Sequence, residues 1–232
     1  MGKSDHESLE VAARLRGAWR GCGVDIAHPF SVRAWNEVAE PAQRLEDCAR
    51  ANPMAFFLAN SRALWRHFVA ALETTPSLLP CADPLDRYIE QAVTAPLAEL
   101  TQRSVVHFSH DVERVRPFGR FAHHCGLAAL GPCQLSIHTS LGPWIALRAV
   151  VIVDLDAIEA PTARNNPCGG CAQPCMEKFS AAQGKGVDAW RSWLEVRKAC
   201  PVGIDMAYGP EQTRYHYTKD RGALRSAISS QP

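Results

Sequence analysis

The chain has 232 residues, of which 47% are apolar and 21% are charged, as in an ordinary globular protein. Twenty-five Lys and Arg residues stand against 24 Asp and Glu residues, so no global charge favours nucleic acid or an anionic membrane. The longest apolar run, Met54–Ala59, is far shorter than the roughly 20 residues that cross a bilayer. Disordered, collagen-like and membrane-spanning chains are therefore excluded.

Nine cysteines are present. The N-terminal segment lacks the apolar stretch of an export signal, so we expect a cytoplasmic protein. Because that compartment keeps thiols reduced, the cysteines are expected to be buried thiols, metal ligands or reactive groups rather than disulfides.

The first predicted elements are a helix and two extended segments. Ser4 opens the S-x-x-E pattern of a capping box, and the amphipathic helix behind it should end near Gly21. A short extended piece is expected at Val24–Ala27. The continuous apolar run Met54–Ala59 has the length of a strand and predicts a position in the centre of a sheet.

Two further helices have recognisable starts. Ser61 is the predicted N-cap of a helix whose apolar residues recur at helical spacing. Asp83 followed by Pro84 is the pattern of an N-cap and a first helical residue, and this helix should run toward Leu100.

The second half begins with a predicted strand at Val105–Phe108 and a helix-like segment at Gly119–Leu130. Leu135–Ile137 and Trp144–Val153 are expected to be two strands joined by a turn at Gly142-Pro143. After residue 156 the chain becomes rich in Pro, Asn, Gly and Cys and then helical. We expect an α/β (α+β) core over residues 1–156 and a helical, cysteine-containing extension over residues 157–232 packed on it.

The sharpest local pattern is Cys168-Gly-Gly-Cys171-Ala-Gln-Pro-Cys175, followed later by Cys200-Pro201. Four thiolates can hold a zinc ion or an iron–sulfur cluster. The irregular gaps suit a structural zinc site better than a ferredoxin-type cluster. The alternative is that the four thiols are buried or idle, and the pattern leaves both interpretations open.

A second candidate group surrounds His123 and Arg148. Small residues near His123 allow a broad, flat molecule to approach the helix, although a lone histidine is more often structural than a ligand. Arg148 interrupts an otherwise apolar strand, and a buried guanidinium needs an anionic partner. That partner is either a core carboxylate such as Asp154 or a carboxylate or phosphate of a ligand.

Residues 135–155, LSIHTSLGPWIALRAVVIVDL, resemble the I-H-x-x-x-G-x-W-x-x-x-R-x-V-V segment of the CblC family of cobalamin-processing proteins. Further resemblances follow in the family's order, and together they span roughly residues 23–225: GVDIAHPFSVRAWNEV, DPLD, AHHCG, WRSW and YGPEQ. The cysteine pattern is absent from the animal members. It resembles the related iron–sulfur branch of epoxyqueuosine reductase and the reductive dehalogenases.

The resemblance implies a nitroreductase-like three-layer α/β/α sandwich with a mixed sheet. It also implies an oxidoreductase that binds cobalamin base-off and removes its upper axial ligand. Cyanide would leave when a reduced flavin (FMN or FAD) supplies electrons, and alkyl groups would be transferred to glutathione. The implied partners are cobalamin, a small-molecule reductant, a second copy in a homodimer and a cobalamin-accepting protein, with no nucleic acid or membrane.

Carried over by position, the resemblance makes Arg148 and Arg197 the arginines that hold glutathione or order the pocket. It places cobalamin beside a larger set of residues: His123, Gly126, Ile137, His138, Gly142, Pro143 and Trp144. Cys168, Cys171, Cys175 and Cys200 stay the predicted metal ligands. Other functions remain open: an iron–sulfur- and cobalamin-dependent reductase resembling epoxyqueuosine reductase, a non-catalytic cobalamin chaperone, and a flavin-binding nitroreductase relative.

Overall fold

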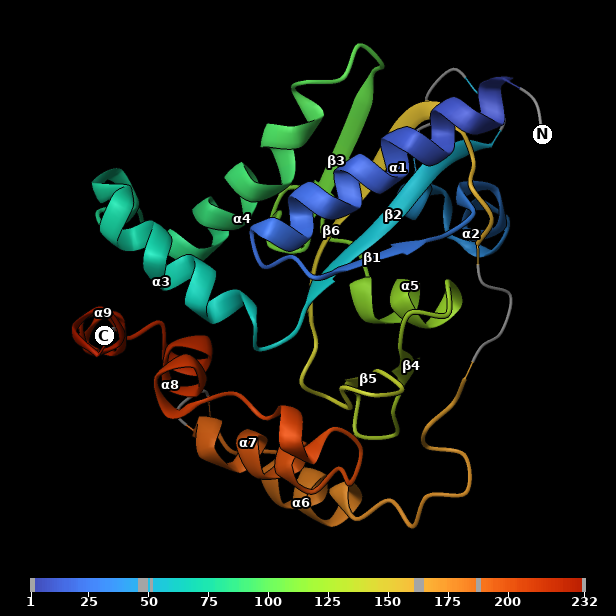
Figure 1. Ribbon diagram of the computed structural model, residues 1–232. Coiled ribbons are helices and arrows are strands. Elements are labelled where there is room, and N and C mark those ends of the chain that lie inside the picture. The colour runs from blue at the N-terminus through green and yellow to red at the C-terminus, as the bar shows by residue number, and fades with distance from the viewer. Residues whose placement is uncertain (1–2, 46–49, 51, 161–164, 187–188, 231–232) are drawn as a thin grey trace.

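A computed structural model describes the chain apart from residues 1–2, 46–49, 51, 161–164, 187–188 and 231–232. Its centre is a four-stranded sheet in which every described pairing is antiparallel (Figure 1). The strands follow one another across the sheet in the order β1 (Ile26–Pro29), β2 (Pro53–Asn60), β6 (Ala146–Asp156) and β3 (Ser104–Phe108). The predicted strands at 54–59 and 105–108 are confirmed.

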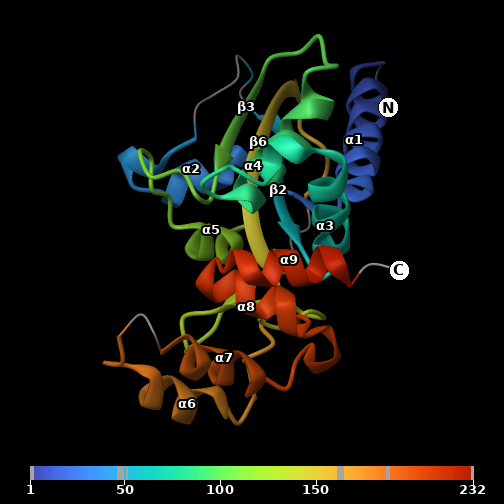
Figure 2. The ribbon, with the colours of Figure 1, turned by 90° about the vertical axis from the view of Figure 1, so that its left-hand side faces the viewer.

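Helices cover both faces of this sheet. Phe56 of β2 packs into an apolar cluster with α1 (Lys3–Gly21), α3 (Leu64–Thr74) and α4 (Pro84–Thr94). Phe57, the next residue along the strand, packs in a second apolar cluster with α2 (Val32–Val38) and α5 (Phe118–His124). Figures 1 and 2 show these helices around the sheet. The expected α+β, three-layer arrangement is confirmed. Short 3-10 turns lie at Pro41–Gln43, Pro76–Leu78, Ala95–Leu97 and Ile204–Met206.

The sheet differs from the expected mixed sheet because its described strands are all antiparallel. All eight residues of β2 are buried. An antiparallel sheet covered by helices on both faces buries its central strand as completely as a parallel sheet does. The apolar run at residues 54–59 therefore located the strand without indicating its direction.

The helix starts show which capping predictions hold. Asp83 is the N-cap of α4, and its carboxylate accepts the backbone N–H of Asp86 at 3.2 Å, as predicted. Ser61 is not an N-cap, because α3 begins after Ala63 and the Ser61 hydroxyl donates to Asp25 at 2.6 Å. The predicted capping box does not mark the start of the first helix, because α1 already begins at Lys3 and contains Ser4.

The segment after α5 folds differently from the prediction. The helix ends at His124, because Gly126 adopts a positive φ of 81° and turns the chain. Two short strands, β4 (Ala129–Leu130) and β5 (Ser136–Ile137), then pair with each other. The predicted hairpin of 135–137 with 144–153 is therefore wrong: β5 pairs with β4, and the second segment joins the main sheet as β6.

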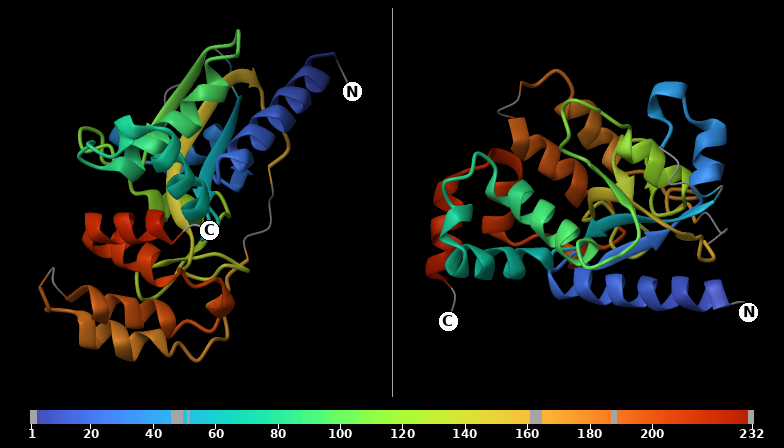
Figure 3. Two further views of the ribbon diagram at one scale, coloured as in Figure 1. Left: turned by 60° about the vertical axis from the view of Figure 1, so that its left-hand side comes forward. Right: turned by 90° about the horizontal axis from the view of Figure 1, so that it is seen from above.

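Four helices gather at the end of the sheet where β2 ends and β6 begins (Figures 1 and 3). These are α6 (Cys175–Ala182), α7 (Trp190–Lys198), α8 (Pro210–Thr218) and α9 (Arg221–Ser229). Tyr215 of α8 and Leu224 of α9 belong to the same apolar cluster as α3. The boundary at residue 156 remains a prediction. No helix in the described part of the chain is long and apolar enough to cross a membrane.

Candidate functional site

A cavity of about 250 Å³, here called the arginine cavity, lies where the start of β6 meets the C-terminal helices. It brings together Arg148 of β6, Arg197 in the last turn of α7 and His216 of α8. The other lining residues are Gln134, Leu135, Ser136, Pro143, Ile145, Ala146 and Leu147. The structure thus places the two predicted catalytic arginines on one cavity, although they are far apart in the sequence.

Arg148 is oriented by a neutral partner. Its Nε donates to Oδ1 of Asn60 at 2.6 Å, and Asn60 is fully buried at the end of β2. Asp154, the carboxylate considered as a partner, instead lies 3.4 Å from Nε of Arg50. Burial lowers the pKa of Arg148, whereas Tyr208 and the acidic residues Asp86 and Asp83 raise it from a distance. Among the described residues, no carboxylate forms an ion pair with Arg148, which lines the cavity.

Arg197 lies among aromatic rings and unpartnered donors. Its guanidinium carbon is 5.9 Å from the ring centres of Trp144 and Tyr208 and 5.8 Å from that of Tyr217. Three of the buried polar groups that have no hydrogen-bond partner within the described residues lie here: Arg197 Nη1, Trp144 Nε1 and the Tyr208 hydroxyl. An unsatisfied buried donor costs about 1–3 kcal/mol, so three of them in one place indicate a surface built for an acceptor ligand.

His216 is the third ionisable residue that lines the arginine cavity, beside Arg148 and Arg197. Burial, and then the charges of Arg197, Arg148 and Lys219, lower the pKa of His216 to about 3. The imidazole is therefore neutral at ordinary pH. None of the described lining residues carries a carboxylate, so the cavity presents two cations and an uncharged ring. Such a wall suits an anionic group.

Two predicted cobalamin-contacting histidines lie at other hollows. His123 is exposed, accepts the backbone N–H of Leu130 at 3.3 Å, and lines a hollow of about 300 Å³. His138 lines a different hollow of about 420 Å³ together with His28. Its Nδ1 accepts the Leu141 N–H at 3.3 Å, and burial lowers the pKa of His138. The structure therefore does not bring the two histidines together.

The remaining predicted contacts are buried, except Gly126, which is half-buried. Ile137 and Trp144 are each 2% exposed, and Gly126 provides the turn after α5. Gly142 has a φ of 56°, and a Cβ added to it would lie 1.9 Å from the carbonyl oxygen of Val202. Glycine is needed here because the backbone of the C-terminal segment lies directly against it.

We expect Gly142→Ala to reduce the free energy of unfolding by about 1–3 kcal/mol, because the added methyl group displaces Val202 and alanine is strained at a positive φ. Urea unfolding followed by tryptophan fluorescence measures the change. Gly17→Ala in α1 is the control, since nothing lies within 4 Å of its added Cβ. Equal stability of the two variants would show that the contact with Val202 is unimportant.

The four cysteines predicted as metal ligands lie on and around the start of α6. Within the described residues, no group of three or more His, Cys, Asp or Glu side chains is arranged to hold a metal ion. Cys168 and Cys171 are half-buried on a loop, whereas Cys175 and Cys200 are buried. Burial raises the pKa of Cys175 to about 12, with a further contribution from the neighbouring Cys133.

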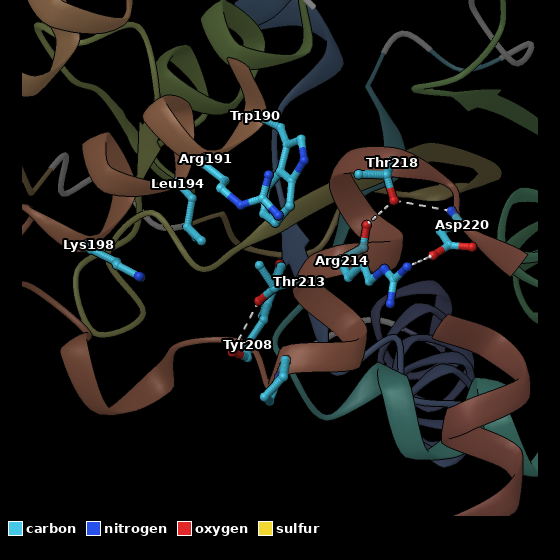
Figure 4. A pocket seen from close by; sticks show the side chains of 10 residues that line it. Trp190, Arg191, Leu194, Lys198, Tyr208, Thr213, Arg214, Thr218 and Asp220 are labelled. Atoms are coloured by element: carbon cyan, nitrogen blue, oxygen red, sulfur yellow. Dashed lines mark hydrogen bonds and ion pairs between the residues drawn. The ribbon is translucent and has the colours of Figure 1, made fainter. Parts of the chain in front are cut away.

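A second, larger cavity of about 920 Å³ lies between α7 and α8 (Figure 4). Trp190, Arg191 and Lys198 stand on one side of it, and Arg214, which pairs with Asp220, stands on the other. Tyr208 also lines this cavity, and its ring contacts that of Trp144, with ring centres 5.5 Å apart. Arg197, which lines the arginine cavity, lies against both of these rings.

Comparisons with known proteins give one decisive finding. No protein-family model matches the sequence, and no curated protein matches it. Among solved structures, the chain is similar to the B12-trafficking protein CblC of C. elegans, a homologue of human MMACHC. The match covers 100% of this chain and 99% of the other, with a TM-score of 0.69 at 15% sequence identity. The chain has the CblC fold. The predicted resemblance is confirmed at the level of the fold.

Several residues at or next to the arginine cavity were not predicted from the sequence. Asn60 directly follows the apolar run 54–59 and, like His216, has no local signal of a role in a site. Tyr208 stood inside a family-like motif, YGPEQ, without a role. Cys133 contacts the cysteine loop from the β4–β5 turn, and no spacing rule links a single cysteine to a distant motif.

Proposed function

We propose that this protein binds cobalamin base-off and removes its upper axial ligand, by reductive decyanation or by alkyl transfer to glutathione. The CblC fold supports this proposal in general terms. The observation that carries it is the convergence of Arg197 Nη1, Trp144 Nε1 and the Tyr208 hydroxyl, three buried donors without a partner in the described chain, beside the arginine cavity.

Glutathione matches the chemistry of the arginine cavity. It carries two carboxylates, and arginine binds a carboxylate through charge-assisted hydrogen bonds in a planar fork. Arg148 and Arg197 supply that charge, and the unpartnered donors would gain acceptors. The same positive field favours the thiolate over the thiol, and the thiolate is the nucleophile. His216, with a pKa of about 3, is too weak a base to take the thiol proton.

The proposed alkyl transfer balances with the thiol as the only co-substrate. The thiolate sulfur attacks the alkyl carbon bound to cobalt, a sulfur–carbon bond forms, and the cobalt–carbon bond breaks with its electron pair left on cobalt. The products are a thioether and reduced cobalamin. For cyanocobalamin, a reduced flavin would supply electrons to cobalt, and cyanide would leave.

Cobalamin is much larger than the arginine cavity, so its binding must also involve the neighbouring segment 138–143. Pro143 lines the arginine cavity and His138 lines the 420 Å³ hollow. Gly142, which pairs with His138 through two backbone hydrogen bonds of 2.9 Å, lies under Val202 and Gly203. We therefore propose that residues 200–206 move off Gly142 when the corrin binds.

The first test is one absorption titration followed by turnover. Protein is added to cyanocobalamin and to methylcobalamin, and the expected result is a shift of the bound vitamin to the base-detached spectrum. Glutathione should then consume bound methylcobalamin and yield S-methylglutathione, measured by mass spectrometry. A shift without turnover would contradict the enzymatic part and favour a chaperone. No shift at any protein excess would contradict cobalamin binding altogether.

Zinc and iron–sulfur clusters are not part of this proposal. No described group of side chains is arranged for a metal ion, so nothing in the structure favours the reductase that resembles epoxyqueuosine reductase. The proposal needs only cobalamin, a thiol and an electron donor.

A further inference from the structure

Five cysteines lie near one another around the start of α6, and the proposed function uses none of them. Cys133 and Cys175 belong to one small buried cluster, which also contains only Ala182 and Val196 as fully buried residues. Cys200 is buried as well. Cys168 and Cys171 differ from these three because they are half-buried on the loop before α6, where a reagent can reach them.

The loop holds Cys168 and Cys171 in a tight turn. The Cys171 backbone N–H donates to the Cys168 carbonyl oxygen at 3.3 Å, and Gly170 takes the positive φ of 76° that such a turn requires. Asn166 fixes the entry to the turn, since its Oδ1 accepts the Cys168 N–H at 3.0 Å. The residues between the two cysteines are exposed glycines, so no side chain separates the thiols.

This turn has the dimensions of a disulfide. The first and fourth Cα atoms of a β-turn are less than about 7 Å apart. The Cα atoms of disulfide-bonded cysteines are usually about 4.4–6.8 Å apart. The Cα separation that such a turn allows is therefore compatible with a disulfide between Cys168 and Cys171, and both thiols are free in this structure.

One of the two thiols accepts a hydrogen bond from the backbone. The Gln173 backbone N–H donates to the sulfur of Cys171 at 3.3 Å. Gln173 adopts a positive φ of 54°, uncommon for a residue with a side chain, and this bend aims the N–H at the sulfur. This contact fixes the position of the Cys171 sulfur, so Cys171 is taken as the attacking thiol of the pair.

We propose that Cys168 and Cys171 form a redox-active dithiol that reduces small-molecule disulfides. The Cys171 thiolate attacks one sulfur of the disulfide, forms a mixed disulfide and releases one thiolate. The Cys168 thiolate then attacks the Cys171 sulfur, closes the Cys168–Cys171 disulfide and releases the second thiolate. The protein loses two electrons and two protons, and the disulfide becomes two thiols. This activity needs neither cobalamin nor the arginine cavity.

The test uses the full-length, pre-reduced protein and glutathione disulfide as the probe. Intact mass spectrometry should show the loss of two hydrogen masses without a lasting glutathione adduct. The tryptic peptide that contains residues 165–178 should carry the linkage between Cys168 and Cys171. Cys168→Ser should stop at a glutathione adduct on Cys171, and Cys171→Ser should react at least about tenfold more slowly. Cys81→Ser, a half-buried cysteine in another loop, is the matched control and should behave as the wild type.

Three results would overturn the proposal. The first is a stable adduct on the wild type with no internal disulfide. The second is a linkage between Cys175 and Cys133 in place of the turn. The third is thiols that react only after a metal chelator is added, since the cysteines would then be metal ligands. Circular dichroism of each variant separates loss of reactivity from loss of the fold.

Discussion

Replacing Arg148 by glutamine is expected to slow glutathione-dependent dealkylation of methylcobalamin by about 5- to 150-fold, which corresponds to about 1–3 kcal/mol for a lost charge-assisted hydrogen bond. Glutamine keeps an amide that can bond to Asn60, so the end of β2 stays anchored while the cavity loses a positive charge. The loss should appear mainly as a higher KM for glutathione, because Arg148 is proposed to hold its carboxylate. Stopped-flow absorbance of bound methylcobalamin at several glutathione concentrations measures it.

Two further variants separate the charge from the geometry. Arg148→Lys keeps the positive charge but loses the planar fork, so its rate should lie between those of the wild type and Arg148→Gln. Arg33→Gln on α2 is the control, because Arg33 is exposed and pairs only locally with Glu37 at 3.2 Å. Unchanged kinetics in Arg148→Gln, with cobalamin still bound, would remove Arg148 from the thiol site.

The predictions that succeeded rest on interactions between residues close in sequence. Asp83 caps α4 because its carboxylate reaches an N–H three residues ahead, and Pro84 suits the first helical position. The apolar run of β2 is buried because helices cover both faces of the sheet. The cap depends only on neighbouring residues, and a continuous apolar run indicates burial whichever elements cover it.

The predictions that failed concern pairing between distant segments. The two residues of β5 carry too little pattern to choose a partner, and they pair with β4 rather than with β6. Ser61 has the right identity for a cap, but the half-buried carboxylate of Asp25 competes for its hydroxyl. Arg148 and Arg197 were predicted as site residues from the resemblance. The hydrogen bond to Asn60 that orients Arg148, and the His216 side of the cavity, come from elements that no local pattern links to them.

The stability of the protein should fall between pH 7 and pH 5 through His216. Its pKa is about 3 in the folded chain, against 6.5 as the ordinary value. Between these values the unfolded chain binds a proton that the folded chain does not, so stability is lost as the pH falls through this window and is unaffected by this group above it. At pH 5, which is 1.5 units below the ordinary value, the loss is about 2 kcal/mol.

Urea unfolding at pH 5, 6 and 7 tests this expectation on the wild type and on His216→Gln. Glutamine cannot be protonated, so the variant should lose about 2 kcal/mol less than the wild type between pH 7 and pH 5. Burial also lowers the pKa of His28 and His138, but both chains keep these groups and the difference isolates His216. His6→Gln, at an exposed position on α1, should follow the wild type. Parallel pH profiles for wild type and His216→Gln would mean that His216 takes up its proton in the folded protein, and the arginine cavity would then hold three positive charges at pH 5.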